Sequence, residues 1–297
     1  MKQVSGTPLS QRLLPEGPLR QYVRRGALKG MSVGGDVSGS TRRALERPRV
    51  QFFYLHFLPS DKVEYFEQFL DFLEQQYEVV PYGRAVELAS SVDVVSPIAA
   101  LSFDDGFLSN IEAGKILERR GISACFFVCT DLVGKDRRQL LRTFPDSLGE
   151  EVGSMSWADI EGLLLRGHEI GSHTRKHPIL SQCGEAEVEE EIVGSRVDLI
   201  SRIGQVDHFA WPCGQWHHFR RDMVDVVYSA GYRSLASAVR GAHVPTASRR
   251  PICLRREHVD LNWPLADVRY LAARSARRAD ATAGEYPGDD ATPSRRS

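Results

Sequence analysis

The sequence lacks the features that mark membrane-spanning, secreted and nucleic-acid-binding proteins. No apolar run in its 297 residues reaches the ~18 residues that a membrane-spanning helix needs. Residues 1–50 contain several arginines but no apolar core of about 7–15 residues, so we expect no secretory signal. The formal net charge is −1, and composition therefore gives no reason to expect a nucleic-acid partner.

Cysteine is also scarce and irregularly spaced. The chain has five cysteines, an odd number, and none of them forms a CxxC pair. This usage argues against a disulfide framework and fits a reducing compartment, so we expect a cytoplasmic protein. The contents of hydrophobic residues (42%) and charged residues (26%) are ordinary for a globular protein.

The chain divides into three regions by composition. Residues 1–48 are rich in Gly, Ser and Arg with little periodicity, and we predict a flexible N-terminal extension. The alternative is an arm that packs on the following domain or on a second subunit. Residues 49–272 alternate buried strands with amphipathic helices, which is typical of parallel β/α units. Residues 273–297 have the composition of a disordered tail.

A long polar segment, Thr130 to Met155, interrupts this alternation between a predicted strand at 123–129 and a predicted helix that begins after Ser156. Loops of this length over an active face are often functional, and a solvated insertion is the other interpretation. The sequence alone leaves both open.

The apolar run Ile98 to Leu101 leads directly into two carboxylates, Asp104 and Asp105, and then Gly106. A strand inside a sheet would bury one of these carboxylates at a cost of about several kcal/mol. We therefore expect the strand to end here and to present the pair at its carboxyl-terminal end, where the glycine allows a sharp turn. Taken alone, Asp-Gly is equally typical of an ordinary turn.

Two histidines, His173 and His177, follow another predicted strand with i, i+4 spacing. In a helical turn this spacing places both on one face. Two imidazoles and one carboxylate suit Zn²⁺ or a similar divalent ion and leave a coordination position open. Taken alone, the pair is also consistent with two surface histidines.

Three motifs together resemble those of the polysaccharide deacetylases, which share the NodB homology domain (carbohydrate esterase family 4). Ser102-Phe103-Asp104-Asp105-Gly106 is similar to their first motif, and His173-Thr174-Arg175-Lys176-His177 is similar to their second. Phe209-Ala210-Trp211-Pro212-Cys213-Gly214 is similar to a variant of the third. Order and spacing agree over roughly residues 50 to 260. The resemblance implies an α/β fold, a distorted, incomplete (β/α) barrel with about seven parallel strands.

The resemblance also implies roles for individual residues. Asp105, His173 and His177 would hold a divalent metal, with Zn²⁺ favoured and Co²⁺, Ni²⁺ or Mn²⁺ as alternatives. Asp104 would act as general base, and the backbone N–H of Cys213 would stabilise the oxyanion. The implied activity is removal of an N-acetyl (acyl) group from an amino sugar of a polysaccharide, glycolipid or precursor by metal-activated water.

The chain departs from the family pattern at two points. Ala210 stands where many members have an arginine that tunes the base, and Arg256 is our candidate replacement, with an ordinary surface arginine as the alternative. No clear copy of the late Leu-x-His motif supplies a general acid. We take His258 as the catalytic candidate, with His243 and His56 also considered.

Four residues are predicted to line the sugar site, and for one of them burial in the core is an explicit alternative. That alternative applies to Trp211, because aromatic residues beside a pocket are more often core. The expected partner is an N-acylated saccharide, and the sequence does not indicate the oligomeric state. The four residues are Trp211, Pro212, Trp216 and His56.

Two other functions remain open at this point. One is hydrolysis of another C–N bond, such as a formamide or a cyclic ureide, at the same metal site. The other is a catalytically impaired homologue that binds carbohydrate, which the missing arginine and the uncertain acid favour slightly. A cytoplasmic location would favour a precursor of a cell-surface polysaccharide or lipopolysaccharide over a finished wall.

Overall fold

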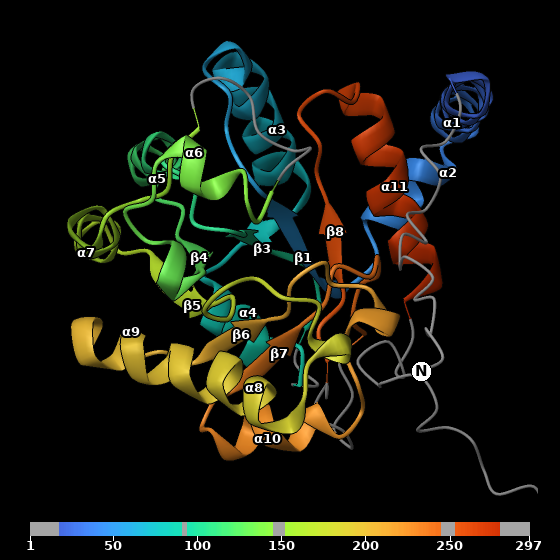
Figure 1. Cartoon of the computed structure of the whole chain (residues 1–297). Coiled ribbons are helices and arrows are strands. Elements are labelled where there is room, and N and C mark those ends of the chain that lie inside the picture. Colours follow the sequence, from blue (N-terminus) through green and yellow to red (C-terminus); the bar gives the residue numbers. More distant parts are fainter. Residues whose placement is uncertain (1–17, 91–93, 145–151, 245–252, 280–297) are drawn as a thin grey trace, which may run out of the picture.

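A parallel sheet, curved into an almost closed barrel, forms the centre of the protein (Figure 1). The computed structural model describes residues 18–90, 94–144, 152–244 and 253–279. The strand order is β7-β6-β5-β4-β3-β1-β8, with the short β2 paired to β3, and every pair of strands is parallel. The strands are β1 (Arg49–Leu55), β2 (Glu78–Val79), β3 (Pro97–Phe103), β4 (Ala124–Val128), β5 (Glu169–Ser172), β6 (His208–Ala210), β7 (Ser234–Ala236) and β8 (Arg256–His258).

The barrel has one incomplete seam, between β7 and β8. A single parallel bridge, from Ala236 to Leu254, joins the two sides. It is reinforced by backbone hydrogen bonds from Ser237 N–H to Leu254 O (2.8 Å) and from Leu254 N–H to Leu235 O (2.7 Å). The predicted incomplete barrel with about seven parallel strands is confirmed.

Helices surround the sheet on its outer side (Figure 1). The first of them, α3, follows the sequence pattern closely, because Phe66, Phe69, Leu70 and Leu73 stand at positions i, i+3, i+4 and i+7 of one helical face and are all buried. The helices of the barrel are α3 (Val63–Gln76), α4 (Tyr82–Leu88), α5 (Asn110–Arg119), α6 (Arg137–Leu140), α7 (Trp157–Leu165), α8 (Glu185–Glu189), α9 (Ser195–Ile203), α10 (Met223–Ser229) and α11 (Leu265–Arg278).

Strands β1, β3 and β4 are buried on both faces, which explains their mostly apolar sequences. On β1, Phe52 belongs to a smaller cluster inside the barrel, together with Ala100 and Phe127. Its neighbour Phe53 belongs to the larger cluster that packs against the helices, with Phe69. This alternation also fixes which residues beyond the strands face the barrel interior, and Asp104 lies two positions after Ser102 on that interior side.

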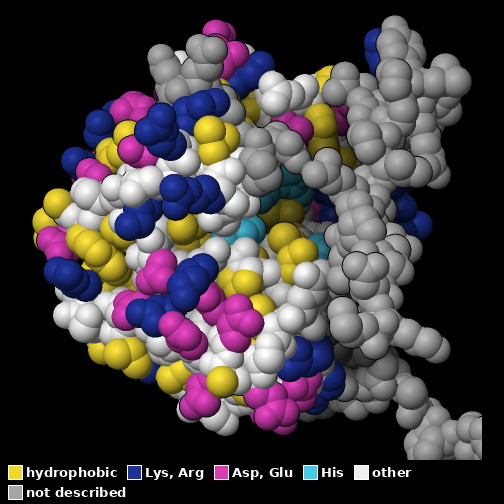
Figure 2. Space-filling model, in the orientation of Figure 1, with side chains coloured by type: hydrophobic (Ala, Val, Ile, Leu, Met, Phe, Trp, Pro, Cys, Tyr) yellow, Lys and Arg dark blue, Asp and Glu magenta, His cyan; other side chains and the backbone are white. Residues whose placement is uncertain are grey.

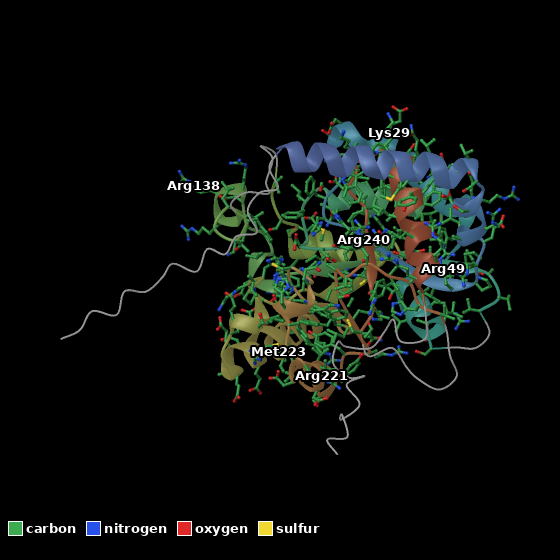
Figure 3. The ribbon with its side chains drawn as sticks, turned by 90° about the vertical axis from the view of Figure 1, so that its right-hand side faces the viewer. Lys29, Arg49, Arg138, Arg221, Met223 and Arg240 are labelled. Atoms are coloured by element: carbon green, nitrogen blue, oxygen red, sulfur yellow. The ribbon has the colours of Figure 1, made fainter. Side chains whose placement is uncertain are left out.

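The region 1–48, predicted as a flexible extension with a packed arm as the alternative, contains two helices whose packing is in line with the alternative. Residues Pro18–Val37 form α1 and Ser40–Leu45 form α2, and both pack against α11. Figure 3 shows α1, which carries Lys29, lying across α11. Small residues make this contact: Ser32 Oγ donates to the Ala266 carbonyl (3.0 Å). A face built from Ser and Gly has almost no hydrophobic periodicity, which is why sequence patterning misses it.

The predicted tail over 273–297 also begins too early. Helix α11 continues to Arg278 and buries Ala273 and Ala276 against the core. Residues 1–17 and 280–297 of the two predicted terminal regions lie outside the described residues. In the part of the chain that is described, none of the helices combines the length and the apolar character needed to cross a membrane.

We predict that α2 contributes to the stability of the barrel. Leu45 is 1% exposed, so Leu45→Ala should lower the free energy of unfolding by about 2–5 kcal/mol. The matched control Val37→Ala, at an 85% exposed position on α1, should change it by less than about 0.5 kcal/mol. Denaturant unfolding measures both, and equally small effects would mean that α2 is not part of the folded domain.

Candidate active site

The candidate site lies at the carboxyl ends of the parallel strands. Asp104 and Asp105 directly follow β3, and His173 directly follows β5, so the order of the strands brings these side chains to one end of the barrel. They line a cavity of about 470 Å³. Figure 2 shows histidine side chains inside the hollow on this face of the molecule. This end of a β/α barrel is where loops can vary without disturbing the sheet.

Three of the predicted residues meet at a common point. Asp105, His173 and His177 each offer one ligand atom, and these atoms lie within 4.8 Å of one another. The Nε2 atoms of His173 and His177 are 3.4 and 3.2 Å from Oδ1 of Asp105. Among the described residues, this Oδ1 atom is buried and has no hydrogen-bond partner. A buried oxygen left in this state beside two imidazole nitrogens fits the donor set of a divalent cation.

The orientation of His173 is fixed from behind. Its Nδ1 lies 2.7 Å from the carbonyl oxygen of Ala210, to which it donates a hydrogen bond. The proton is therefore on Nδ1, and the lone pair of Nε2 faces Asp105. Histidines that bind metals are usually held in this way. The sequence identified Ala210 only as the position of a missing arginine, and its carbonyl group has this second role.

The electrostatics of this cluster keep the carboxylate ionised. Burial alone would raise the pKa of Asp105, but the adjacent His177 and His173 outweigh it and hold that pKa well below its usual value. For His173, burial alone would lower the pKa, but the adjacent Asp105 carboxylate and the charge of Asp104 outweigh it and raise that pKa above the usual histidine value.

The backbone is strained at the site. Within the described residues, four that are not glycine have a positive φ: Asp105 (72°), Thr174 (70°), His177 (61°) and Cys213 (60°). All four belong to the three motifs. Such conformations cost about 1–3 kcal/mol each and persist where the surrounding structure enforces them. At Asp105 the consequence is direct, because the turn of the backbone lets two adjacent carboxylates line the same cavity.

Asp104 is paired with a buried arginine. Arg256 donates from both terminal nitrogens to the two carboxylate oxygens of Asp104, each at 2.8 Å, and is completely buried. Its Nε donates to the Ser237 carbonyl (2.7 Å), and its guanidinium lies 4.4 Å from the centre of the Tyr54 ring. The alternative of an ordinary surface arginine is excluded. Burial would raise the pKa of Asp104, but the charge of Arg256 outweighs it and lowers that pKa.

The histidines proposed as general acid separate into two groups. His56 and His258 both line the cavity, with their ring centres 5.3 Å apart. Burial, followed by the charges of His56 and Arg240, lowers the pKa of His258 to about 3. His243 is buried elsewhere, where its Nε2 accepts from the backbone N–H of Arg255 (3.0 Å), and it does not line this cavity.

The predicted sugar-site residues are only partly at the cavity. His56 lines it, and Trp211 borders it while being fully buried and stacked on Phe219, with ring centres 4.6 Å apart. Cys213, the predicted oxyanion donor, also lines the cavity. The core alternative therefore holds for most of the Trp211 ring. Pro212 and Trp216 lie outside the lining of the cavity. Trp216 does so because its ring packs against Trp211, 5.9 Å away, on the core side.

Sequence reasoning missed an aromatic wall of the cavity. Phe107 and Phe144 belong to a small apolar cluster, and the Phe144 ring lies 4.8 Å from that of His177. Phe144 comes from the long segment 130–155, so part of this segment borders the site and the interpretation as a purely solvated insertion is wrong. Residues 145–151 lie outside the described residues. One sequence signal for this wall was available: Phe107 directly follows the Asp-Asp-Gly motif and is therefore close to the site.

A parallel β/α barrel with paired carboxylates and two histidines at the carboxyl ends of its strands has the architecture of a barrel hydrolase. Residues 92–235 match the family model described as polysaccharide deacetylase. Over these residues the chain is similar to the polysaccharide deacetylase family, which agrees with the resemblance that its motifs carry.

Comparison with individual proteins agrees with this placement. The chain is 29% identical over 125 residues to a chitooligosaccharide deacetylase of Sinorhizobium fredii, a match that covers 41% of this chain and 49% of the relative. The chain thus spans about half the length of that curated relative.

Solved structures show the same fold at lower identity. IcaB from Ammonifex degensii has a TM-score of 0.64 and 21% identity, over 78% of this chain and 98% of that one. A de-N-acetylase from Aggregatibacter actinomycetemcomitans has a TM-score of 0.59 and 15% identity, over 75% of this chain and 99% of that one.

We predict that the protein binds one divalent ion and binds it less tightly as the pH falls. Protonated His173 cannot ligate, and because its pKa is raised, protons compete with the ion at a higher pH than at an ordinary histidine. Titration with Co²⁺ at about pH 8 and about pH 6 tests this. Weaker binding at the lower pH, and its loss in His177→Ala, are expected; equal affinity at both pH values would contradict the prediction.

Proposed function

We propose that the protein is a metal-dependent deacetylase that removes an N-acetyl (acyl) group from an amino sugar of a polysaccharide, glycolipid or precursor. The observation that carries this proposal is that one cavity is lined both by the Asp105–His173–His177 cluster and by Asp104, whose carboxylate Arg256 holds from behind the cavity wall. The name of the curated relative, a chitooligosaccharide deacetylase, supports the same class of substrate.

The metal would be held by Asp105, His173 and His177. A mixed set of one oxygen and two nitrogen donors favours Zn²⁺, with Co²⁺, Ni²⁺ and Mn²⁺ as alternatives. When bound, such an ion would lower the pKa of a coordinated water and polarise the amide carbonyl. The protein supplies the fixed geometry, because the hydrogen bond from His173 Nδ1 to Ala210 sets the direction of one ligand.

Asp104 acts as the proton acceptor in this proposal. Its pairing with Arg256 keeps the carboxylate ionised at neutral pH, and each carboxylate oxygen retains a lone pair after accepting one hydrogen bond from the guanidinium. The bidentate geometry also fixes the plane of the carboxylate. Arg256 thereby orients the base from β8, which compensates for the alanine at position 210.

Proton donation to the leaving amine is assigned to the His56–His258 pair. A histidine whose pKa is about 3 is neutral at pH 7 and is a poor donor, so we place the donated proton on His56 and a positioning role on His258. Cys213 lines the same cavity, and its backbone N–H would donate to the oxyanion of the tetrahedral intermediate.

The size and walls of the cavity suit a neutral sugar ring that carries an acyl group. Its volume of about 470 Å³ lies in the range of small-molecule sites, and Tyr54, Phe57, Phe107 and Phe144 provide aromatic surface. The cytoplasmic location stays a prediction. If it holds, the substrate would be a soluble or lipid-linked precursor of a cell-surface polysaccharide.

Release of a free amine from N-acetylated amino sugars tests the proposed activity. We predict that Asp104→Asn retains the metal ion and loses turnover by about 10²–10⁴-fold, because it removes the proton acceptor and none of the three ligands. Metal analysis and an amine-release assay on the same preparation measure both quantities. An unchanged rate in Asp104→Asn would rule out its role as base.

The assay also includes N-formyl sugars and the variants His56→Gln and His258→Gln. Faster release from N-formyl than from N-acetyl substrates would favour hydrolysis of another C–N bond. A larger loss of turnover in His56→Gln than in His258→Gln is expected from the assignment of the proton donor, and the reverse order would exchange the two roles.

A further inference from the structure

We infer that Glu191, which lies outside all three motifs, is a positioning residue that holds the segment between the two histidine ligands. Its carboxylate binds the backbone of the turn between His173 and His177. Among the described residues it hydrogen-bonds to neither histidine side chain, and it acts on the metal site only through that turn. The inference rests on the proposed function, because it assigns a purpose to Glu191 at the proposed metal site.

The contact is made by two consecutive backbone amides. Oε2 of Glu191 accepts from the N–H of Arg175 (2.8 Å) and from the N–H of Lys176 (2.9 Å). Both donors lie between His173 and His177 in the sequence. Consecutive N–H groups that converge on one anion form a concave anion site, and here the anion is a side chain of the protein itself.

The turn that these amides belong to has an unfavourable backbone conformation at each end. Thr174 (φ 70°) and His177 (φ 61°) are both in the left-handed region, which residues other than glycine rarely adopt. The hydrogen bond from His177 N–H to Thr174 Oγ1 (3.1 Å) closes the turn internally. Glu191 supplies an external contact to its two middle residues, and so opposes relaxation of the turn to an ordinary conformation.

The position of Glu191 depends on a local change of helix type. Residues Glu190–Gly194 form a π-helical turn between α8 and α9, and Glu191 is the second residue of that turn. A π-helical turn inserts an extra residue and re-aims the side chains around it, and such turns are frequent at functional sites. Glu191 is 2% exposed, whereas the side chain of the adjacent Glu190 is 51% exposed.

The burial of the Glu191 carboxylate indicates that its contacts with the turn matter for the fold of this segment. A buried carboxylate is costly unless its oxygens are hydrogen-bonded, and the two amides of the ligand turn provide this. The nearest arginine of the turn is engaged elsewhere: the side chain of Arg175 bonds to Asp198 (2.9 Å) and to Glu190 (3.0 Å). Glu191 is therefore directed at the backbone of the turn, and its negative charge lies behind the two ligands.

The same stretch of helix also contacts the residue before the turn and a loop beside it. Ser195 Oγ lies 2.7 Å from Ser172 Oγ, which immediately precedes His173. Asp198 accepts from Thr130 Oγ1 (2.8 Å) at the start of the neighbouring loop. Glu191 is the central contact of this set, because it is the one of the three that accepts from backbone N–H groups between the two ligands.

The consequence is a prediction about metal affinity in the full-length protein. Removing the charge in Glu191→Gln, which keeps the shape of the side chain, should weaken binding of Co²⁺ or Zn²⁺ by about 10–100-fold, the range typical for residues that orient metal ligands. The matched control Glu190→Gln removes the same charge one residue earlier, at an exposed position, and should change the dissociation constant by less than about 3-fold.

Metal titration of the wild type and both variants, at a temperature where all are folded, makes the comparison. A residue with a merely structural role would lower the melting temperature of the metal-free protein and leave the dissociation constant unchanged. That result in Glu191→Gln, or an equal loss of affinity in Glu190→Gln, would overturn the inference.

Hydrogen exchange of the metal-free wild type gives a second test, which depends on neither the variant nor the ion. The amides of Arg175 and Lys176 are expected to be protected, and free exchange at both would overturn the inference even if Glu191→Gln fails to fold. A wild type that binds the ion but releases no amine would contradict the proposed activity and leave this inference standing.

Discussion

The buried ion pair between Asp104 and Arg256 is the interaction on which the site depends. Two charged groups at 3% and 0% exposure are stable in a protein interior only when each satisfies the other. Here the guanidinium meets both carboxylate oxygens at 2.8 Å, and its remaining nitrogen bonds to a backbone carbonyl across the open seam. The pair keeps Asp104 ionised and oriented beside a cluster that is itself built around a second carboxylate, Asp105.

The sheet order explains how these residues come together. Strand β1 lies between β3 and β8, so residues 104 and 256 are brought together from positions 152 apart in the sequence. The pair also lies near the incomplete seam, because Arg256 Nε bonds to Ser237 just after β7. Arg256 therefore has two roles: it links the two sides of the seam, which a single bridge otherwise joins, and it orients the proposed base.

The sequence pattern was sufficient for parallel β/α units, and the resemblance carried by the motifs implied that they form a barrel. Buried strands give continuous apolar runs, and the side chains at their ends, Asp104, Asp105 and His173, are polar residues in places where a strand must stop. For Arg256 the sequence left two interpretations open, a partner of the base and an ordinary surface arginine. The choice depends on the order of the strands, which local sequence patterns do not reveal. The left-handed backbone conformation of Asp105 could not be predicted from the sequence either, since only Gly106 indicated a turn there. Helices α1 and α2 were missed for a different reason: most of their buried positions are small or polar, such as Ser32 and Thr41, and the buried Leu45 alone leaves little hydrophobic pattern.

A double-mutant cycle on the free energy of unfolding tests the central pair most directly. The variants are Arg256→Met, Asp104→Asn and the combination of both, in metal-free protein. Arg256→Met alone should cost about 3–5 kcal/mol, because it leaves a buried carboxylate without its partner. The double variant should recover a large part of that loss, since no unpaired charge remains. Additive effects of the two substitutions would show that the two side chains do not depend on each other, and would contradict this account of the site.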